Sequence, residues 1–206
     1  TMSSKKDGLV NIGGFIALND EGIFRKASNF TIIYEGFITY GGMAGRDMAA
    51  LAQGLDEATE FPYLESRISQ VELLGNLLIE YGIPVQKPIG GHAVFLDALK
   101  FLPNIKREEF PAQTLALEIY KEAGIRGVEI GTILADRDPE TRENRYPKLE
   151  LVRLALPRRT YTDNHIRYIA AALKNVFDRR DEITKGYKIT WESEILRHFT
   201  VKLEQA

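Results

Sequence analysis

Thr1-Met2-Ser3-Ser4-Lys5-Lys6-Asp7 opens the chain and leads into an apolar, glycine-broken segment at residues 9–17. Two hydroxyls beside two lysines favour a site where a lysine reaches a carbonyl while hydroxyl and backbone donors hold a phosphate. Pyridoxal phosphate carries both a carbonyl and a phosphate group. Lys6 would form the Schiff base, a role that partial burial and the positive charge of Lys5 would favour. The alternative is a solvated basic turn before a strand, since turns rich in Ser and Lys are common.

Six stretches, spread along the whole chain, carry a family resemblance. They are the opening heptapeptide, Tyr40-Gly41-Gly42-Met43-Ala44-Gly45-Arg46-Asp47-Met48, Gly90-Gly91-His92-Ala93-Val94-Phe95-Leu96-Asp97, Phe110-Pro111-Ala112-Gln113, Val128-Glu129-Ile130-Gly131 and Arg197-His198-Phe199-Thr200. In this order they resemble the second half of the β-eliminating lyases, the family of tryptophanase and tyrosine phenol-lyase. Six ordered motifs are more specific than any one of them.

The resemblance implies an α/β fold of the PLP-dependent transferase-like class, also known as the aspartate aminotransferase fold or fold type I. Residues 1–62 would be the C-terminal remnant of the PLP-binding large domain. Residues 63–206 would form a linking helix and a small α+β domain. A complementary N-terminal polypeptide would supply the partner of the pyridine nitrogen, the aromatic that stacks on the cofactor and most of the phosphate cradle. The complete enzyme would be a homo-oligomer, a tetramer.

The resemblance also assigns roles near the N-terminus. Lys6 matches the Schiff-base lysine, and Ser3 matches the serine that bonds the cofactor phosphate. Lys5 matches a lysine that assists proton traffic and active-site hydration. Asn11 matches the residue whose backbone carbonyl coordinates a monovalent cation, which would be potassium. Because that contact uses the backbone, the Asn11 side chain adds almost no independent support.

Arg153 stands out in the predicted strand at residues 149–156. A period of two places it on the same face as Leu149, Leu151 and Ala155, so the guanidinium would lie on an otherwise apolar face and need a partner. That partner could be a structural carboxylate or the α-carboxylate of a substrate, which arginine grips through two hydrogen bonds. Arg153 matches the substrate-carboxylate arginine of the family.

Two positions address the choice of substrate. Tyrosine phenol-lyases place an arginine for the phenol hydroxyl at the position of Ile130, and a second phenylalanine at that of His198. The resemblance implies that Ile130, His198 and Phe199 bind the substrate. An apolar Ile130 suits an indole ring, and His198 could accept or relay the indole N–H proton. Both positions match tryptophanase, whereas residues 147–150 and 157–159 are closer to the phenol-lyases. Without the resemblance, His198 would be a structural residue of a terminal strand.

The sequence is therefore interpreted as the C-terminal half of a PLP-dependent lyase that cleaves L-tryptophan to indole, pyruvate and ammonia. One alternative is tyrosine phenol-lyase or a related amino-acid β-lyase. Another, of a different class, is a non-catalytic binding or assembly subunit that lacks the N-terminal half.

Composition limits other functions. The net charge is −2, with basic residues scattered along the chain, which gives no electrostatic footprint for nucleic acid. The chain has no cysteine, which excludes disulfides and thiolate sites. There is no long apolar run and no signal-peptide pattern, so a cytoplasmic protein without a membrane segment is expected.

Hydrophobic patterns predict the secondary structure. A buried strand is expected at residues 9–19, an extended segment at 30–37 and a long amphipathic helix at 63–81. The other predicted helices are 21–28, one that begins at 47, 111–123 and 164–178. The other predicted strands are 85–86, 93–96, 127–130, 149–156, 187–191 and 199–203, and a surface loop is expected at 136–146.

Overall fold

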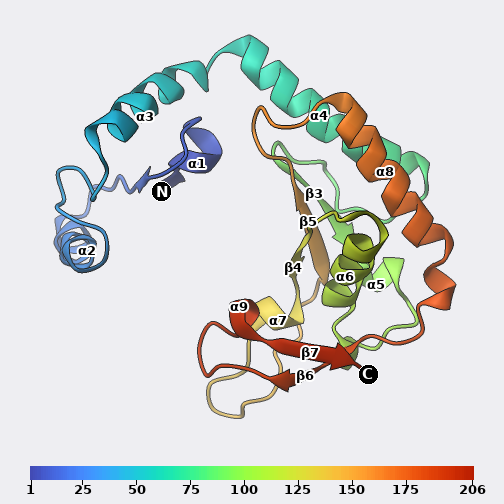
Figure 1. Cartoon of the computed structure of the whole chain (residues 1–206). Helices are drawn as coiled ribbons and strands as arrows, with labels where there is room; N and C mark the ends of the chain where they lie inside the picture. The colour runs from blue at the N-terminus through green and yellow to red at the C-terminus, as the bar shows by residue number, and fades with distance from the viewer. The chain divides into compact units, whose positions relative to one another are not determined.

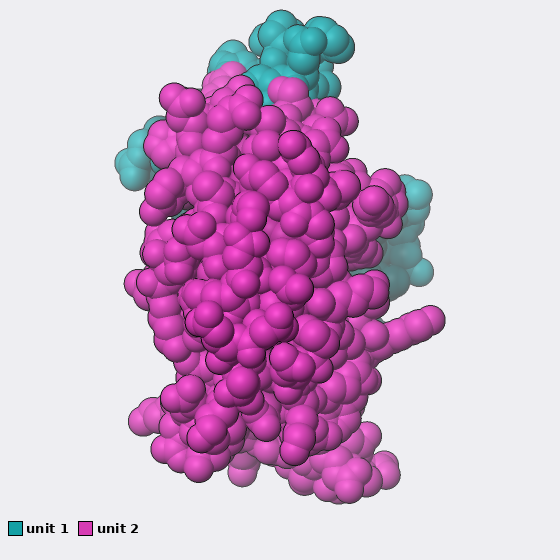
Figure 2. Space-filling view, turned by 90° about the vertical axis from the view of Figure 1, so that its right-hand side faces the viewer, with its two compact units in different colours: residues 1–67 teal, residues 68–206 magenta.

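The computed structural model describes every residue of the chain and divides it into two compact units, Thr1–Arg67 and Ile68–Ala206 (Figure 2). Both units mix helices and strands, so the fold is mixed α/β. None of the helices combines the length and apolar character needed to cross a membrane. The further division into a large-domain remnant and a small domain remains a prediction.

Unit 1 contains short strands and two longer helices. Its elements are β1 (Met2–Ser3), α1 (Ser4–Asp7), β2 (Gly14–Phe15), α2 (Glu21–Tyr34) and α3 (Gly45–Glu57) (Figure 1). Strands β1 and β2 pair antiparallel. Val10 is the one buried hydrophobic residue of this unit, and α2 buries none of its side chains. Unit 1 therefore has very little hydrophobic core of its own.

Two predictions for unit 1 are wrong. The expected strand at residues 9–19 is interrupted because Leu9 and Gly13 have φ values of 53° and 96°, which no strand accepts. Residues 30–34 belong to α2 instead of an extended segment. The Asp20 side chain caps this helix by accepting a bond from the Ile23 N–H, 2.8 Å away. The β-branched run gains no partner strand here, so local helical bonds prevail.

Unit 2 is built around a three-stranded antiparallel sheet. The helix α4 (Phe61–Glu80) leads into this unit. The remaining elements are β3 (Ala93–Asp97), α5 (Ala98–Phe101), η1 (Arg107–Glu109), α6 (Pro111–Ala123), β4 (Val128–Ile130), α7 (Thr132–Ala135), β5 (Leu151–Ala155), α8 (Asp163–Asp178), η2 (Arg180–Glu182), β6 (Tyr187–Trp191), α9 (Arg197–Thr200) and β7 (Lys202–Gln205).

The sheet has the order β3-β5-β4, with β5 in the centre. Its core face carries Val94, Leu96, Val152 and Leu154, which belong to the main hydrophobic cluster. The helices α5, α6 and α8 lie on one side of the sheet in Figure 1. Since strand side chains alternate, Arg153 lies on the opposite face from this cluster.

Most predicted elements of unit 2 are confirmed, including helix 111–123 and strand 187–191. Pro111 begins α6, and Gly124 ends it in the left-handed conformation, with φ 67°. The predicted strand at 199–203 is wrong in its first part. The chain turns at Leu196, with φ 58°, and makes the single turn α9 before β7 pairs with β6.

Candidate functional site

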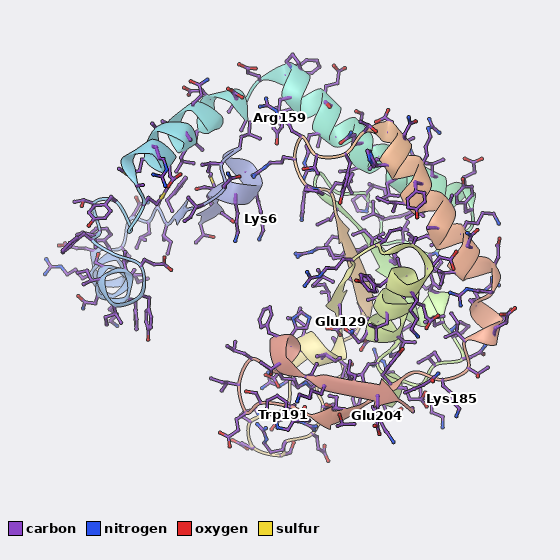
Figure 3. All side chains as sticks on the ribbon, in the orientation of Figure 1. Lys6, Glu129, Arg159, Lys185, Trp191 and Glu204 are labelled. Atoms are coloured by element: carbon purple, nitrogen blue, oxygen red, sulfur yellow. The ribbon has the colours of Figure 1, made fainter.

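The lysine pair lies on α1, a single helical turn of unit 1. Lys5 and Lys6 are both exposed, whereas the preceding Ser4 is buried. Figure 3 labels Lys6 on this turn. The Ser4 amide donates to the Gly13 carbonyl, 3.0 Å away, which ties the turn to the segment before β2. The partial burial predicted for Lys6 is absent, because α1 presents both lysines on the outer side of this turn.

Two glycines allow the segment after Lys6 to pack against α3. A Cβ added to Gly54 would lie 1.9 Å from the carbonyl oxygen of Gly8, so only glycine permits this approach. The loop that follows contains Asn11, whose side chain is exposed. Unit 1 thus fixes the backbone on both sides of the predicted cation ligand.

The residues of unit 1 fit the lysine part of a pyridoxal phosphate site. The Lys6 amine is exposed and makes no ion pair within the chain. Ser3 stands at the start of α1, but its hydroxyl does not cap that helix. An accessible amine beside an uncommitted hydroxyl is suited to a carbonyl-phosphate ligand.

The residues predicted to bind the substrate all lie in unit 2. In the sheet register, Val128 faces Arg153 and Ile130 faces Leu151. Because alternate residues share a face, Ile130 and Arg153 lie on the same side of the sheet. The sheet therefore brings together two residues that are far apart in the sequence.

Arg153 has no carboxylate partner in the chain, and its buried Nε has no hydrogen-bond partner. The face around it is more open than predicted, since Ala155 is exposed and Leu149 is 46% exposed. The reason is that the main hydrophobic cluster lies on the other face of β5. The structural ion pair considered for Arg153 is thus not made.

His198 and Phe199 lie on α9, next to the free edge of β4. Nε2 of His198 is 3.0 Å from the main-chain oxygen of Glu129, the residue before Ile130. The Phe199 ring is 79% exposed and meets the His198 ring edge-on at 5.2 Å. The terminal-strand location expected for His198 is wrong, because the chain forms α9 there.

Arg197 anchors α9 to the rest of unit 2. Its side chain is only 1% exposed. The guanidinium donates to the side chain of Asn144 at 2.8 Å and to the carbonyl of Thr132 at 2.9 Å, and it pairs with Glu192 at 3.4 Å. A buried arginine with three partners holds the short helix in one place.

Two buried carboxylates lie under this helix. Glu129 accepts bonds from the Ile133 and Leu134 amides, at 3.1 and 3.0 Å, while Glu150 accepts from the hydroxyl and amide of Thr132. Burial raises the pKa of the Glu129 carboxyl to about 7, partly offset by these amide bonds. Glu129 can therefore exist with or without its proton near neutral pH.

Neither Glu129 nor Arg197 was assigned a role from the sequence. Both lie within stretches that carried the resemblance, Val128-Glu129-Ile130-Gly131 and Arg197-His198-Phe199-Thr200. A carboxylate inside a short apolar strand is the signal that could have drawn attention to Glu129.

Comparison with known proteins gives the family. The family model described as beta-eliminating lyase matches residues 1–172. The chain belongs to the beta-eliminating lyase family. It is 67% identical to a probable beta-eliminating lyase of Trichomonas vaginalis, over 100% of this chain and 45% of that protein.

Two bacterial relatives are named tyrosine phenol-lyase. The chain is 52% identical to that of Nostoc punctiforme, over 99% of this chain and 44% of the relative. It is 50% identical to that of Clostridium tetani, over 100% of this chain and 45% of the relative. The chain thus spans less than half the length of the curated relatives it matches.

Proposed function

We propose that the chain is the C-terminal half of a PLP-dependent lyase that cleaves L-tryptophan to indole, pyruvate and ammonia. Lys6 is the lysine that binds the cofactor, and Ser3 contributes to its phosphate site. The upstream half supplies the rest of the cofactor site, within a fold of type I. Bound pyridoxal phosphate would supply the electron sink for removal of the substrate α-proton.

The observation that carries this proposal is the unpaired Arg153 on the same sheet face as Ile130. An arginine whose buried Nε lacks a partner is suited to a ligand carboxylate, which would provide two hydrogen bonds. In the proposed enzyme, Arg153 binds the substrate α-carboxylate and so orients the amino acid. Lys5 assists proton traffic beside Lys6, and the Asn11 carbonyl binds potassium.

The preference for tryptophan rests on two side chains. Ile130 offers the substrate ring an apolar surface, where a phenol hydroxyl would find no hydrogen-bond partner. His198 offers a ring nitrogen as acceptor for an indole N–H. Phe199, exposed beside His198, provides an aromatic edge for the same ring.

Tyrosine phenol-lyase is the second candidate, because relatives of 50% and 52% identity carry that name. In this alternative, Ile130 and His198 would not exclude a phenol ring. The two candidates predict opposite preferences between tryptophan and tyrosine.

The test is an assay of the complete enzyme, made by joining this chain to the upstream half of the Trichomonas relative. We expect indole from tryptophan with a higher kcat/KM than phenol from tyrosine. The double variant Ile130→Arg, His198→Phe should reverse this ratio. Arg153→Lys is the matched control: it should lower kcat/KM for both substrates by about tenfold to a hundredfold, without changing their ratio. A wild-type preference for tyrosine would overturn the tryptophan assignment.

A further inference from the structure

His198 contacts Glu129 twice through one ring nitrogen. Nε2 lies 3.0 Å from the main-chain oxygen of Glu129 and 3.3 Å from its carboxyl Oε2. A main-chain carbonyl can only accept a hydrogen bond, so Nε2 carries a proton. In the neutral ring, Nδ1 is then the only nitrogen that can accept one.

Nδ1 of His198 is buried and has no hydrogen-bond partner in the chain. Buried polar atoms without a partner are rare in folded proteins, because the lost hydration is not replaced. An N–H on a ligand ring would supply the missing partner. The His198 side chain is 16% exposed, so part of its ring remains accessible while Arg197 holds α9 in place.

We propose that Glu129 is a positioning residue for recognition of the substrate ring: it holds His198 with the proton on Nε2, so that Nδ1 accepts a hydrogen bond from the N–H of an indole-type leaving group. This inference rests on the proposed function and adds a residue to it. When the ring gains a proton at carbon, its N–H becomes more positive and donates more strongly. The bond to Nδ1 is then strongest in the transition state, where it accelerates the reaction.

The surroundings of Glu129 suit this role. A Cβ on Gly131 would lie 2.7 Å from Glu129 Oε1 and 2.1 Å from Glu150 Oε2, so glycine is needed for both carboxylates to approach the backbone. Glu150, Arg197 and His198 are the charged or titratable groups that face Glu129. Figure 3 shows Glu129 on β4, near α7 and α9. The Ile133 and Leu134 amides of α7 thus fix the Glu129 carboxyl independently of its contact with His198.

Glu150 provides a matched control. It is a second buried carboxylate beside Gly131, but it bonds Thr132 and makes no bond to His198. Glu129→Gln and Glu150→Gln are therefore the same chemical change in the same neighbourhood. A purely structural role for Glu129 would make the two variants behave alike.

The first test does not depend on lyase activity. NMR of the 206-residue chain, labelled with ¹⁵N in its three histidines, reports which ring nitrogen carries the proton. For His198 we expect a protonated Nε2 and a bare Nδ1 in the wild type and in Glu150→Gln. In Glu129→Gln the main-chain oxygen still accepts from Nε2, but the side-chain amide can donate to Nε2 in place of the carboxylate, so the share of this tautomer should fall below that of the wild type. A wild-type proton on Nδ1, or equal effects of the two variants, would overturn the proposal.

The second test uses the complete enzyme with tryptophan. Glu129→Gln should lower kcat about tenfold with KM nearly unchanged, a part of the 10²–10⁴-fold that an acid-base group contributes. Glu150→Gln should leave kcat within about twofold at matched folded fractions. His198→Asn, whose amide oxygen can stand in for Nδ1, should retain more activity than His198→Gln, whose amide stands in for Nε2. The reverse order would contradict the proposal.

The two tests distinguish the role of Glu129 from the lyase activity itself. If the complete wild-type enzyme had no lyase activity, the proposed function would fail, while the NMR result would still decide whether Glu129 sets the tautomer of His198.

Discussion

The two units of the chain differ in how they bury apolar side chains. Every member of the main hydrophobic cluster lies between Val71 and Ile183, whereas unit 1 buries Val10 alone. In α2, Phe30 and Ile33 are 61% and 69% exposed. An exposed apolar set of this kind marks a surface that another polypeptide covers. The contrast accords with the proposal of an upstream half, and it predicts that unit 2 folds without unit 1.

The largest expected effect is from cutting the chain between these regions. A polypeptide of residues 61–206 retains α4 and the whole cluster, so it should unfold cooperatively in urea, as a single domain does. Residues 1–60 alone should show no cooperative transition, because so little apolar surface is buried. Circular dichroism during urea titration measures both. Cooperative unfolding of residues 1–60 would show that unit 1 has a hydrophobic core of its own.

One core and one surface substitution test the same difference between the two units. Leu74→Ala removes a fully buried side chain of α4 and should lower the free energy of unfolding by about 2–5 kcal/mol. Ile33→Ala, in exposed α2, should change it by less than about 0.5 kcal/mol. Urea denaturation of the 206-residue chain compares them directly. Similar losses in the two variants would show that α2 packs against a core.

The buried Glu129 makes unit 2 sensitive to pH. Its pKa is about 7 in the folded chain, against 4.5 for the unperturbed group. Between these values the unfolded chain releases this proton first, so the stability that Glu129 contributes is full below pH 4.5 and is lost as pH rises toward 7. The loss is on the order of 3 kcal/mol. Glu129→Gln should remove this slope. Glu150→Gln should keep most of it, because burial is the main cause of the raised pKa of Glu129 and the charge of Glu150 is a smaller one, as measured by urea denaturation from pH 5 to 8. An unchanged slope in Glu129→Gln would contradict the assignment.

The smallest expected effect on the main unfolding transition is from a substitution at the start of α2. Asp20→Ala removes the side-chain acceptor of the Ile23 amide and should destabilise this helix by about 1 kcal/mol. Because α2 contributes nothing to the core of unit 2, only helicity at low temperature should fall. The midpoint of the main urea transition should not move, and a clear shift would indicate coupling of α2 to unit 2.

The sequence predicted the elements that carry strong local signals. Helix α6 has Pro111 at its start and Gly124 at its end, and its bounds were predicted correctly. The wrong predictions fall where an unusual backbone conformation or a contact with distant residues determines the local structure. Leu9 adopts a positive φ that no pattern announces, and α9 is a helical turn because buried Arg197 binds groups far away in the sequence.

The site could be predicted only in part, for a similar reason. Lys6, Arg153 and His198 were found through the resemblance, but their surroundings depend on the fold. The link between Glu129 and His198 joins residues 69 positions apart, which no spacing rule reveals. The openness of the Arg153 face likewise depends on which side of the sheet the helices cover.

One measurement tests most directly the claim that unit 1 carries the cofactor lysine and needs an upstream half. The chain and a separately produced upstream half of the Trichomonas relative are mixed with pyridoxal phosphate, and the visible absorbance of lysine-bound cofactor is recorded before and after borohydride reduction, with peptide mapping. We expect a stable cofactor band only in the mixture, its loss in Lys6→Ala and a reduced adduct on Lys6. The same band in Lys6→Ala, or an adduct on another lysine, would contradict this role of Lys6.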